Sequence, residues 1–257
     1  MVMTDRVPPD YIKNIPPDHG STILGMHDTC SGRIFMLGTG PSLIDQLPLL
    51  ERLKDEVTFG CNTLARWDAL PFSPTYYGIS DVHDPGSIDA LGELIPESTI
   101  AFNVRWPKYY TGQRFHAVSK AHDSRQFHSH GLVGFGDDLP GLSTGRTTPL
   151  TLVQVAIWLG YRQFYFLGIE QSRGYCYDPE TRVSGFKQDP FPLDKNPKYR
   201  IAVKKSAQRM REDIEAAGGS VFDCTPGGLL NVTGKGIHTD VPAGDILPYQ
   251  DLAEVLA

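Results

Sequence analysis

The residues best suited to chemistry in this sequence stand in a glycine turn that follows a short apolar run. Residues 33–37 are predicted to form a buried strand, and the turn after it reads Gly38-Thr39-Gly40-Pro41-Ser42. Two glycines let the backbone turn tightly, and a proline suits the first turn of a helix because it needs no amide partner there. A helix that starts at the end of a parallel strand directs free amides and a positive dipole end at a ligand, most often phosphate. The turn therefore predicts a nucleotide site.

A second set of anion-binding residue types precedes the apolar stretch 147–159 and comprises Ser143, Thr144, Gly145 and Arg146. Hydroxyls, helix-start amides and a guanidinium would together hold an anion. Capping of the helix by Ser143 or Thr147 is the alternative interpretation, and it needs no ligand. The arginine favours ligand binding.

Polar residues also close three other predicted strands. Asn62 follows the run 57–61, and its amide could bind a base or a ribose. Asp81 follows the next strand, and with Asp84 it forms a short acidic segment that could bind Mg²⁺, although aspartates are also common in turns. Glu170 follows the strand 162–167 and is a candidate general base or hydroxyl-binding group.

Aromatic and imidazole side chains lie in the less regular segments. Tyr175 and Tyr177 could cover a base or a sugar, or could only pack at the rim of a site. His128 is a candidate general base within a stretch that holds four histidines. We expect the catalytic groups to be among Asp81, Glu170 and His128.

The elements that must position these residues alternate along the chain. Apolar runs predict strands near 33–37, 57–61, 75–79, 99–102, 162–167 and 221–224, and helical patterns cover 43–53, 147–159 and 203–217. This rhythm predicts an α/β, Rossmann-like fold with a mostly parallel sheet and helices on both faces. In such folds the ligand lies over the carboxyl ends of the strands.

The remaining segments set the expected domain boundaries. Residues 1–30 are proline-rich and are expected to form an extension, 31–235 the nucleotide-binding transferase domain, and 236–257 a tail. The stretches 103–142 and 171–197 show no clear period, which is typical of a lid or substrate-binding insertion.

Composition narrows the function classes. A net charge of −6 over 257 residues gives no basic surface for a nucleic acid. No apolar run reaches the roughly 20 residues needed to span a bilayer, and the polar N-terminus does not resemble a signal peptide. Four scattered cysteines without Cys-x-x-Cys spacing predict reduced thiols and a cytoplasmic protein. A homo-oligomer is left open.

The glycine turn is an incomplete dinucleotide fingerprint. It lacks the third glycine of Gly-x-Gly-x-x-Gly, and Asn62 stands where an acidic residue would bind a ribose. Both departures argue against a nicotinamide or flavin enzyme.

Taken together, the strand ends resemble the MptE-like family, named after an archaeal 6-hydroxymethylpterin diphosphokinase, with bacterial relatives associated with surface glycosylation. The resemblance spans roughly residues 33 to 234 and rests on Leu37 to Leu43, Gly60-Cys61-Asn62, Tyr77 to Asp81, Ser143-Thr144-Gly145, Phe166 to Glu170 and Cys224 to Leu229. It implies a nucleotide-dependent transferase, and in the diphosphokinase it would imply Mg²⁺ held by Asp81 or Asp84.

The same landmarks are similar to the bacterial CMP-sialic acid-dependent sialyltransferases. That similarity implies a nucleotide near Gly38, Thr39, Gly40, Ser42 and Asn62, a sugar or phosphate near Ser143 to Gly145, and the leaving phosphate near Tyr175 or Tyr177. This sequence departs from those enzymes at two places. They have a histidine base shortly before the last long helix, where residues 196–200 here hold no histidine, and they have an asparagine at the strand end where this chain has Asp81.

The sequence therefore predicts a nucleotide-dependent transferase, first a glycosyltransferase that uses a nucleotide-activated sugar, with a CMP-sugar suspected, for surface glycan synthesis. A Mg²⁺-dependent diphosphokinase that uses ATP is the second hypothesis. A nucleotide-binding protein without catalysis is the third.

Overall fold

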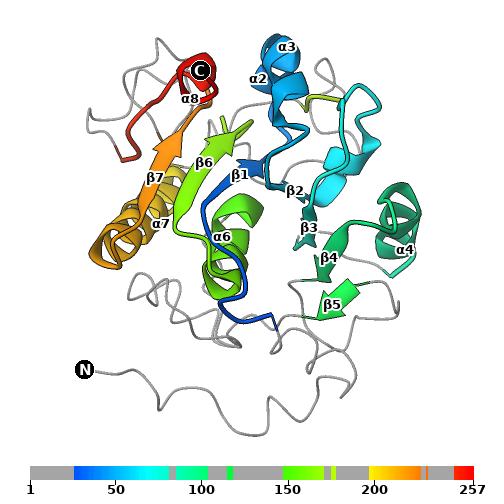
Figure 1. Cartoon of the computed structure of the whole chain (residues 1–257), viewed down its shortest axis with the longest axis horizontal. Helices are drawn as coiled ribbons and strands as arrows, with labels where there is room; N and C mark the ends of the chain where they lie inside the picture. The colour runs from blue at the N-terminus through cyan, green and yellow to red at the C-terminus, as the bar shows by residue number, and fades with distance from the viewer. Residues whose placement is uncertain are drawn as a thin grey trace, which may run out of the picture.

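In the computed structural model, residues 26–80, 85–103, 115–117, 147–170, 175–177, 197–226, 230 and 246–257 are described. Their centre is a seven-stranded sheet with the order β5-β4-β3-β2-β1-β6-β7 (Figure 1). The strands are β1 (Arg33–Leu37), β2 (Thr58–Cys61), β3 (Tyr76–Ile79), β4 (Ile100–Asn103), β5 (Phe115–Ala117), β6 (Gln163–Leu167) and β7 (Ser220–Asp223). Every neighbouring pair is parallel, which confirms the predicted α/β, Rossmann-like fold.

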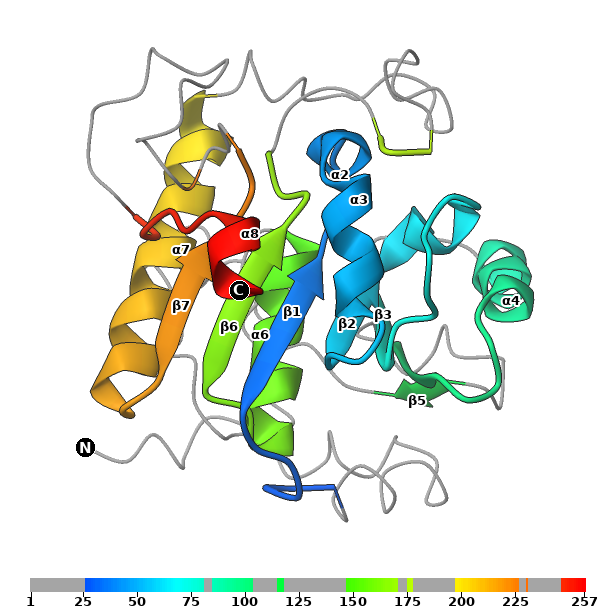
Figure 2. The ribbon, with the colours of Figure 1, turned by 45° about the horizontal axis from the view of Figure 1, so that its top comes forward.

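Two layers of helices cover the two faces of this sheet (Figure 2). Helices α6 (Thr148–Leu159) and α7 (Pro197–Ala216) pack on one face against alternate strand residues such as Ile34, Met36 and Phe166. The other face carries α2 (Ser42–Asp45), α3 (Leu47–Leu50), η2 (Glu51–Leu53), η3 (Asn62–Arg66), α4 (Pro85–Leu94) and α8 (Leu252–Val255). Burial on both faces explains why the strands read as continuous apolar runs.

Helix α6 follows the sequence prediction closely. Thr147 caps its first turn with its side-chain oxygen, and Gly160 ends it in the left-handed conformation with φ 114°. A glycine adopts that conformation without the steric cost that a Cβ would bring.

The helix predicted over 43–53 is divided into α2, α3 and η2. Pro48 lies in the first turn of α3, where its ring fits, but a continuous helix would place it in the interior and remove a hydrogen bond. The prediction of helical structure over 43–53 was therefore correct, but the helix is not continuous.

Four elements were not predicted: η3, α4, β5 and α8. Helix α4 has a weakly apolar pattern that starts at a proline, and β5 is three residues long, too short for a period of two to stand out. Strand β5 lies within the stretch 103–142 that was predicted to be irregular, and it extends the sheet beyond β4 through parallel pairing.

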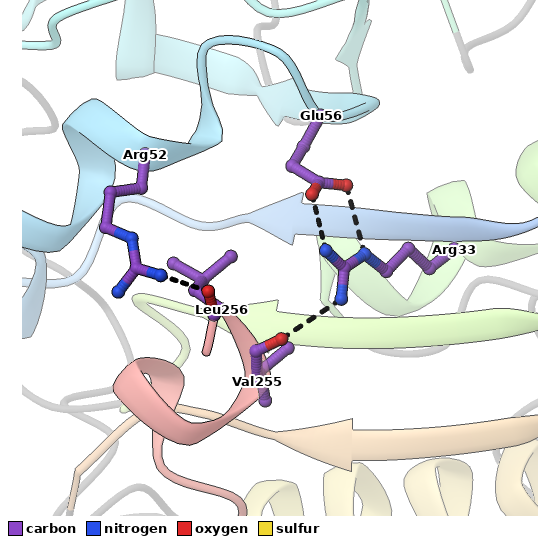
Figure 3. Close-up of polar contacts among 5 residues, drawn as sticks. All are labelled: Arg33, Arg52, Glu56, Val255 and Leu256. Carbon is purple, nitrogen blue, oxygen red and sulfur yellow. Dashed lines mark hydrogen bonds and ion pairs between the residues drawn. The ribbon is translucent and has the colours of Figure 1, made fainter.

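The C-terminal residues 246–257 return to the sheet. Asp223 at the end of β7 forms a parallel bridge with Tyr249, and Leu252 of α8 is buried against the sheet. Figure 3 shows two arginines that bind carbonyl oxygens at the end of α8. Arg33 of β1 donates to Val255 at 3.1 Å and also to Glu56 at 3.0 Å, while Arg52 donates to Leu256. The segment therefore runs from the carboxyl end of β7, at Tyr249, to the amino end of β1, at Val255, and is part of the folded unit.

Candidate functional site

The strand order reverses direction between β1 and β6. The chain runs outward from β1 through β5 on one side, then returns to place β6 and β7 on the other side of β1. Leu37 and Leu167, the last residues of these two strands, are paired in register. A reversal of this kind leaves the loops above the two strands free to diverge, and it is where ligands bind in open α/β sheets.

The glycine turn is fastened to the loop that follows β6. The Gly38 amide donates to Leu167 at 2.8 Å, and the Gly40 amide donates to Gly168 at 2.8 Å. Gly168 has φ 68°, so its own backbone must also turn in the left-handed region. Because Pro41 has no amide hydrogen, the turn offers fewer free donors than its sequence suggested.

Glu170 reaches back beneath this turn. Its Oε1 accepts a hydrogen bond from the Ser42 amide, and its side chain is only 6% exposed. Its Oε2 is buried and has no hydrogen-bond partner among the described residues. Burial raises the pKa of the Glu170 carboxyl above its ordinary value, by more than hydrogen bonding from Ser42 lowers it. A protein carboxyl group therefore stands at the start of α2, where a phosphate was expected.

The close approach of Glu170 explains why position 40 is a glycine. A Cβ placed on Gly40 would lie 1.5 Å from Oε2 of Glu170 and 2.7 Å from the Gly168 oxygen. The requirement at this position is space for the carboxyl group and not an unusual backbone angle.

Asn62 connects three elements at the carboxyl edge. Its Oδ1 accepts from the Ser80 amide at 3.0 Å, and its Nδ2 donates to Thr148 Oγ1 at 2.8 Å. The hydroxyls of Ser80 and Thr148 lie 2.7 Å apart and are both buried. Asn62 itself has φ 48°, a left-handed conformation that asparagine tolerates better than most residues. The network fixes the ends of β2 and β3 against the first turn of α6.

Tyr175 and Tyr177 lie beside the glycine turn. Their rings stack with centroids 5.0 Å apart and an interplanar angle of 8°. Between them, the Cys176 amide donates to the Thr39 oxygen at 2.9 Å, which ties this segment to the turn. The Tyr177 hydroxyl lies 2.7 Å from Thr63 Oγ1 on η3. Burial raises the pKa of Tyr177 to about 12, so this phenol is protonated at neutral pH.

The end of β6 is held from the other side by residues after β7. The Ile169 amide donates to Thr225 Oγ1 at 3.1 Å, and the Thr225 amide donates to Asp223 Oδ1 at 2.9 Å. Gln46, which lies between α2 and α3, donates through Nε2 to the Cys224 oxygen at 2.8 Å. These buried contacts fix the backbone that carries Glu170.

The described part of the site thus brings together the predicted residues Gly38, Thr39, Gly40, Ser42, Asn62, Glu170, Tyr175 and Tyr177. The other predicted site residues lie outside the described residues: Asp81, Asp84, His128, Ser143, Thr144, Gly145 and Arg146. Their roles stay predictions.

The sequence prediction did not name several residues that form contacts at this edge of the sheet. Thr63, Ser80 and Thr148 form its hydroxyl contacts, and each lies at, or one residue from, the end of a strand or the start of a helix. That position was the available signal. Thr225 gave no such signal, because its contact with Ile169 depends on how β6 and β7 pair.

Within the described residues, no group of three or more histidine, cysteine, aspartate or glutamate side chains is arranged to hold a metal ion. Among the helices that the structure describes, none combines the length and apolarity needed to cross a membrane. All four cysteines are free thiols.

Comparison with known proteins gives distant structural likenesses alone. No protein-family model and no curated protein sequence matches the chain. Among solved structures, the MAf glycosyltransferase from Magnetospirillum magneticum AMB-1 has a TM-score of 0.49 at 15% identity, over 96% of this chain and 40% of that protein. This chain therefore spans well under half of that enzyme.

Two sialyltransferases from Campylobacter jejuni are also similar. CstII in complex with CMP-3FNeuAc has a TM-score of 0.46 at 16% identity, over 84% of this chain and 97% of that protein. The monofunctional alpha-2,3-sialyltransferase Cst-I has a TM-score of 0.46 at 15% identity, over 83% and 89% of the two chains. Likeness at this level does not specify an activity.

Proposed function

We propose that this chain is a nucleotide-dependent transferase, and specifically a glycosyltransferase that uses a nucleotide-activated sugar. The observation that carries the proposal is the row of polar groups along the carboxyl edge of the sheet from β3 to β6, which includes the point between β1 and β6 where the strand order reverses. A site built in this way suits a nucleotide, whose base, ribose and phosphate need separate sets of contacts.

The sequence motifs at these strand ends support a CMP-sugar as the donor. The glycine turn, the Cys61-Asn62 pair and the segment Phe166 to Glu170 resemble the CMP-sialic acid-dependent sialyltransferases, and all three lie at this edge of the sheet. We propose a role in surface glycan synthesis on the same resemblance.

Glycosyl transfer requires that the leaving phosphate be stabilised and the acceptor hydroxyl be deprotonated. Glu170 is a predicted base, but its carboxyl group is buried beneath the turn and bound to the Ser42 amide. We assign it the positioning of the glycine turn. The proposed base is then Asp81 or His128.

A nucleotide panel tests the proposal. Thermal shift and calorimetry with CMP, UDP, GDP, ADP and ATP, each with and without Mg²⁺, should give stabilisation by CMP that does not depend on the metal. Stabilisation by ATP only in the presence of Mg²⁺ would instead support the diphosphokinase. No response to any nucleotide would refute nucleotide binding altogether.

The nucleotide-binding assignment of Asn62 has its own test. Replacement Asn62→Asp keeps the size of the side chain but removes the Nδ2 donor to Thr148 and adds a negative charge. We expect CMP affinity to fall with an intact fold, as judged by circular dichroism. Unchanged affinity would mean that Asn62 serves only the network of β2, β3 and α6.

A further inference from the structure

The described edge of the site contains three hydrogen-bond donors that are not used by any described residue. The first is the guanidinium of Arg66, the last residue of η3. Its side chain is exposed, and no hydrogen bond or ion pair joins it to another described residue. An arginine without a carboxylate partner beside a nucleotide site is a candidate anion-binding group.

The second donor belongs to the hydroxyl pair of Thr63 and Tyr177. These oxygens lie 2.7 Å apart, so one hydroxyl donates its hydrogen to the other. Whichever one donates, the second hydroxyl keeps a hydrogen that the pair does not use, and no described residue accepts it. The pair therefore presents an O–H donor to whatever occupies the site.

The third donor is the Thr39 amide. Within residues 38–42, the amides of Gly38, Gly40 and Ser42 are bound to the β6 loop, whereas the amide of Thr39 has no acceptor among the described residues. Its carbonyl oxygen holds Cys176, the neighbour of Tyr177, so the turn and the tyrosine segment are adjacent.

Helical geometry places Arg66 on the same side as the hydroxyl pair. Thr63 and Arg66 are three residues apart on a 3₁₀ helix, in which side chains at that separation eclipse one another. Since Thr63 touches Tyr177, Arg66 also faces the tyrosine segment. In agreement, the positive charge of Arg66 acts to lower the pKa of the Tyr177 phenol, against the larger effect of burial.

We propose that Arg66 and Thr63 complete a subsite for the phosphate of the donor nucleotide around the Tyr177 hydroxyl, with the Thr39 amide at its border; the likeness to the sialyltransferases already implies Tyr177 near that phosphate, and the cationic group is the new assignment. The inference deepens the proposed function and rests on it. Donors without an acceptor suit an anion, and this set combines a fixed positive charge with an oriented hydroxyl. Sequence reasoning had assigned the positive charge at this site to Arg146.

Calorimetry with CMP and with cytidine, which lacks the phosphate, tests the subsite. For Arg66→Gln we expect CMP affinity to fall about tenfold or more, as for loss of a charge-assisted hydrogen bond, while cytidine affinity stays at the wild-type value. Arg66→Lys should retain part of the CMP affinity, because it keeps the charge but loses the planar donor geometry.

Lys54→Gln is the matched control, since it removes one exposed positive charge just before β2, at the opposite edge of the sheet. It should bind CMP as the wild type does.

Equal CMP affinity of Arg66→Gln and wild type would overturn the role of Arg66 and leave the proposed function standing. An equal loss for CMP and cytidine would assign Arg66 to the fold instead. Failure of the wild-type chain to bind CMP would refute the CMP-donor proposal, and the subsite with it.

Discussion

Replacement of Gly40 by alanine tests the packing of Glu170 beneath the glycine turn. The new Cβ would lie 1.5 Å from Oε2 and 2.4 Å from Cδ of Glu170. Contacts this short cannot be relieved by small adjustments, so the carboxyl group must leave its place. The Ser42 amide then loses its acceptor in a buried setting.

The expected cost follows from that displacement. A hydrogen bond to a charged group contributes about 1.5–3 kcal/mol, and overpacking in a well-filled interior adds about 1–3 kcal/mol. We therefore expect Gly40→Ala to lower the free energy of unfolding by about 2.5–6 kcal/mol. Glu170→Ala loses the same hydrogen bond, so the double variant should be about 2 kcal/mol more stable than the sum of the single losses predicts.

Chemical denaturation of the four proteins in this cycle measures the coupling. Gly38→Ala provides the control, because its Cβ would meet the Gly168 backbone, with the oxygen at 2.2 Å, and Glu170 is not among its nearest contacts. The cycle of Gly38→Ala with Glu170→Ala should show no comparable coupling. Additive losses for Gly40→Ala and Glu170→Ala, within about 0.5 kcal/mol, would refute the described packing.

Three further predictions concern stability and reactivity. The pKa of Glu170 is raised in the folded chain, so the folded state keeps this proton after the unfolded state has lost it near the ordinary value of 4.5. The free energy of unfolding of the wild type, measured relative to Glu170→Gln, should therefore fall as the pH rises from about 4 to 8. A difference that does not change with pH would contradict the raised pKa. Iodoacetamide should modify the partly exposed Cys30 before the buried Cys176, whose thiol pKa burial raises to about 12, and mass spectrometry that finds the reverse order would contradict this packing. Thr148→Val should cost about 1–3 kcal/mol in denaturation experiments because Asn62 and the buried Ser80 both lose a partner, and an unchanged free energy of unfolding would contradict this network.

The parallel sheet was predictable because each central strand is a short apolar run with a turn signal after it. Most residues of 33–37 and 164–167 are buried, so their apolar composition marks them as inner strands. Helix α6 was equally clear, since it is apolar on nearly every side and ends at Gly160. Strand β5 is only three residues long and was not predicted, because its place depends on pairing with β4 and not on its own pattern.

The strand ends were predictable as a group, but the partners of their side chains were not. Asn62 and Glu170 were recognised because polar residues that close apolar strands gather at one edge. Sequence position does not reveal that Glu170 turns toward Ser42 or that Asn62 binds Thr148, since both contacts join segments more than 80 residues apart. Such pairings depend on the strand order, which the sequence left open.

The position of Glu170 changes what the glycine turn means for binding. A turn of free amides would draw a phosphate directly to the start of α2. Here the Ser42 amide already has a carboxyl partner, and the Gly38 and Gly40 amides are bound to the β6 loop. A phosphate placed at the same point would compete with these contacts and would meet a buried acidic group. The turn is therefore better suited to holding the backbone rigid, and the proposed phosphate subsite lies with the donors at its border, of which Arg66 carries the positive charge.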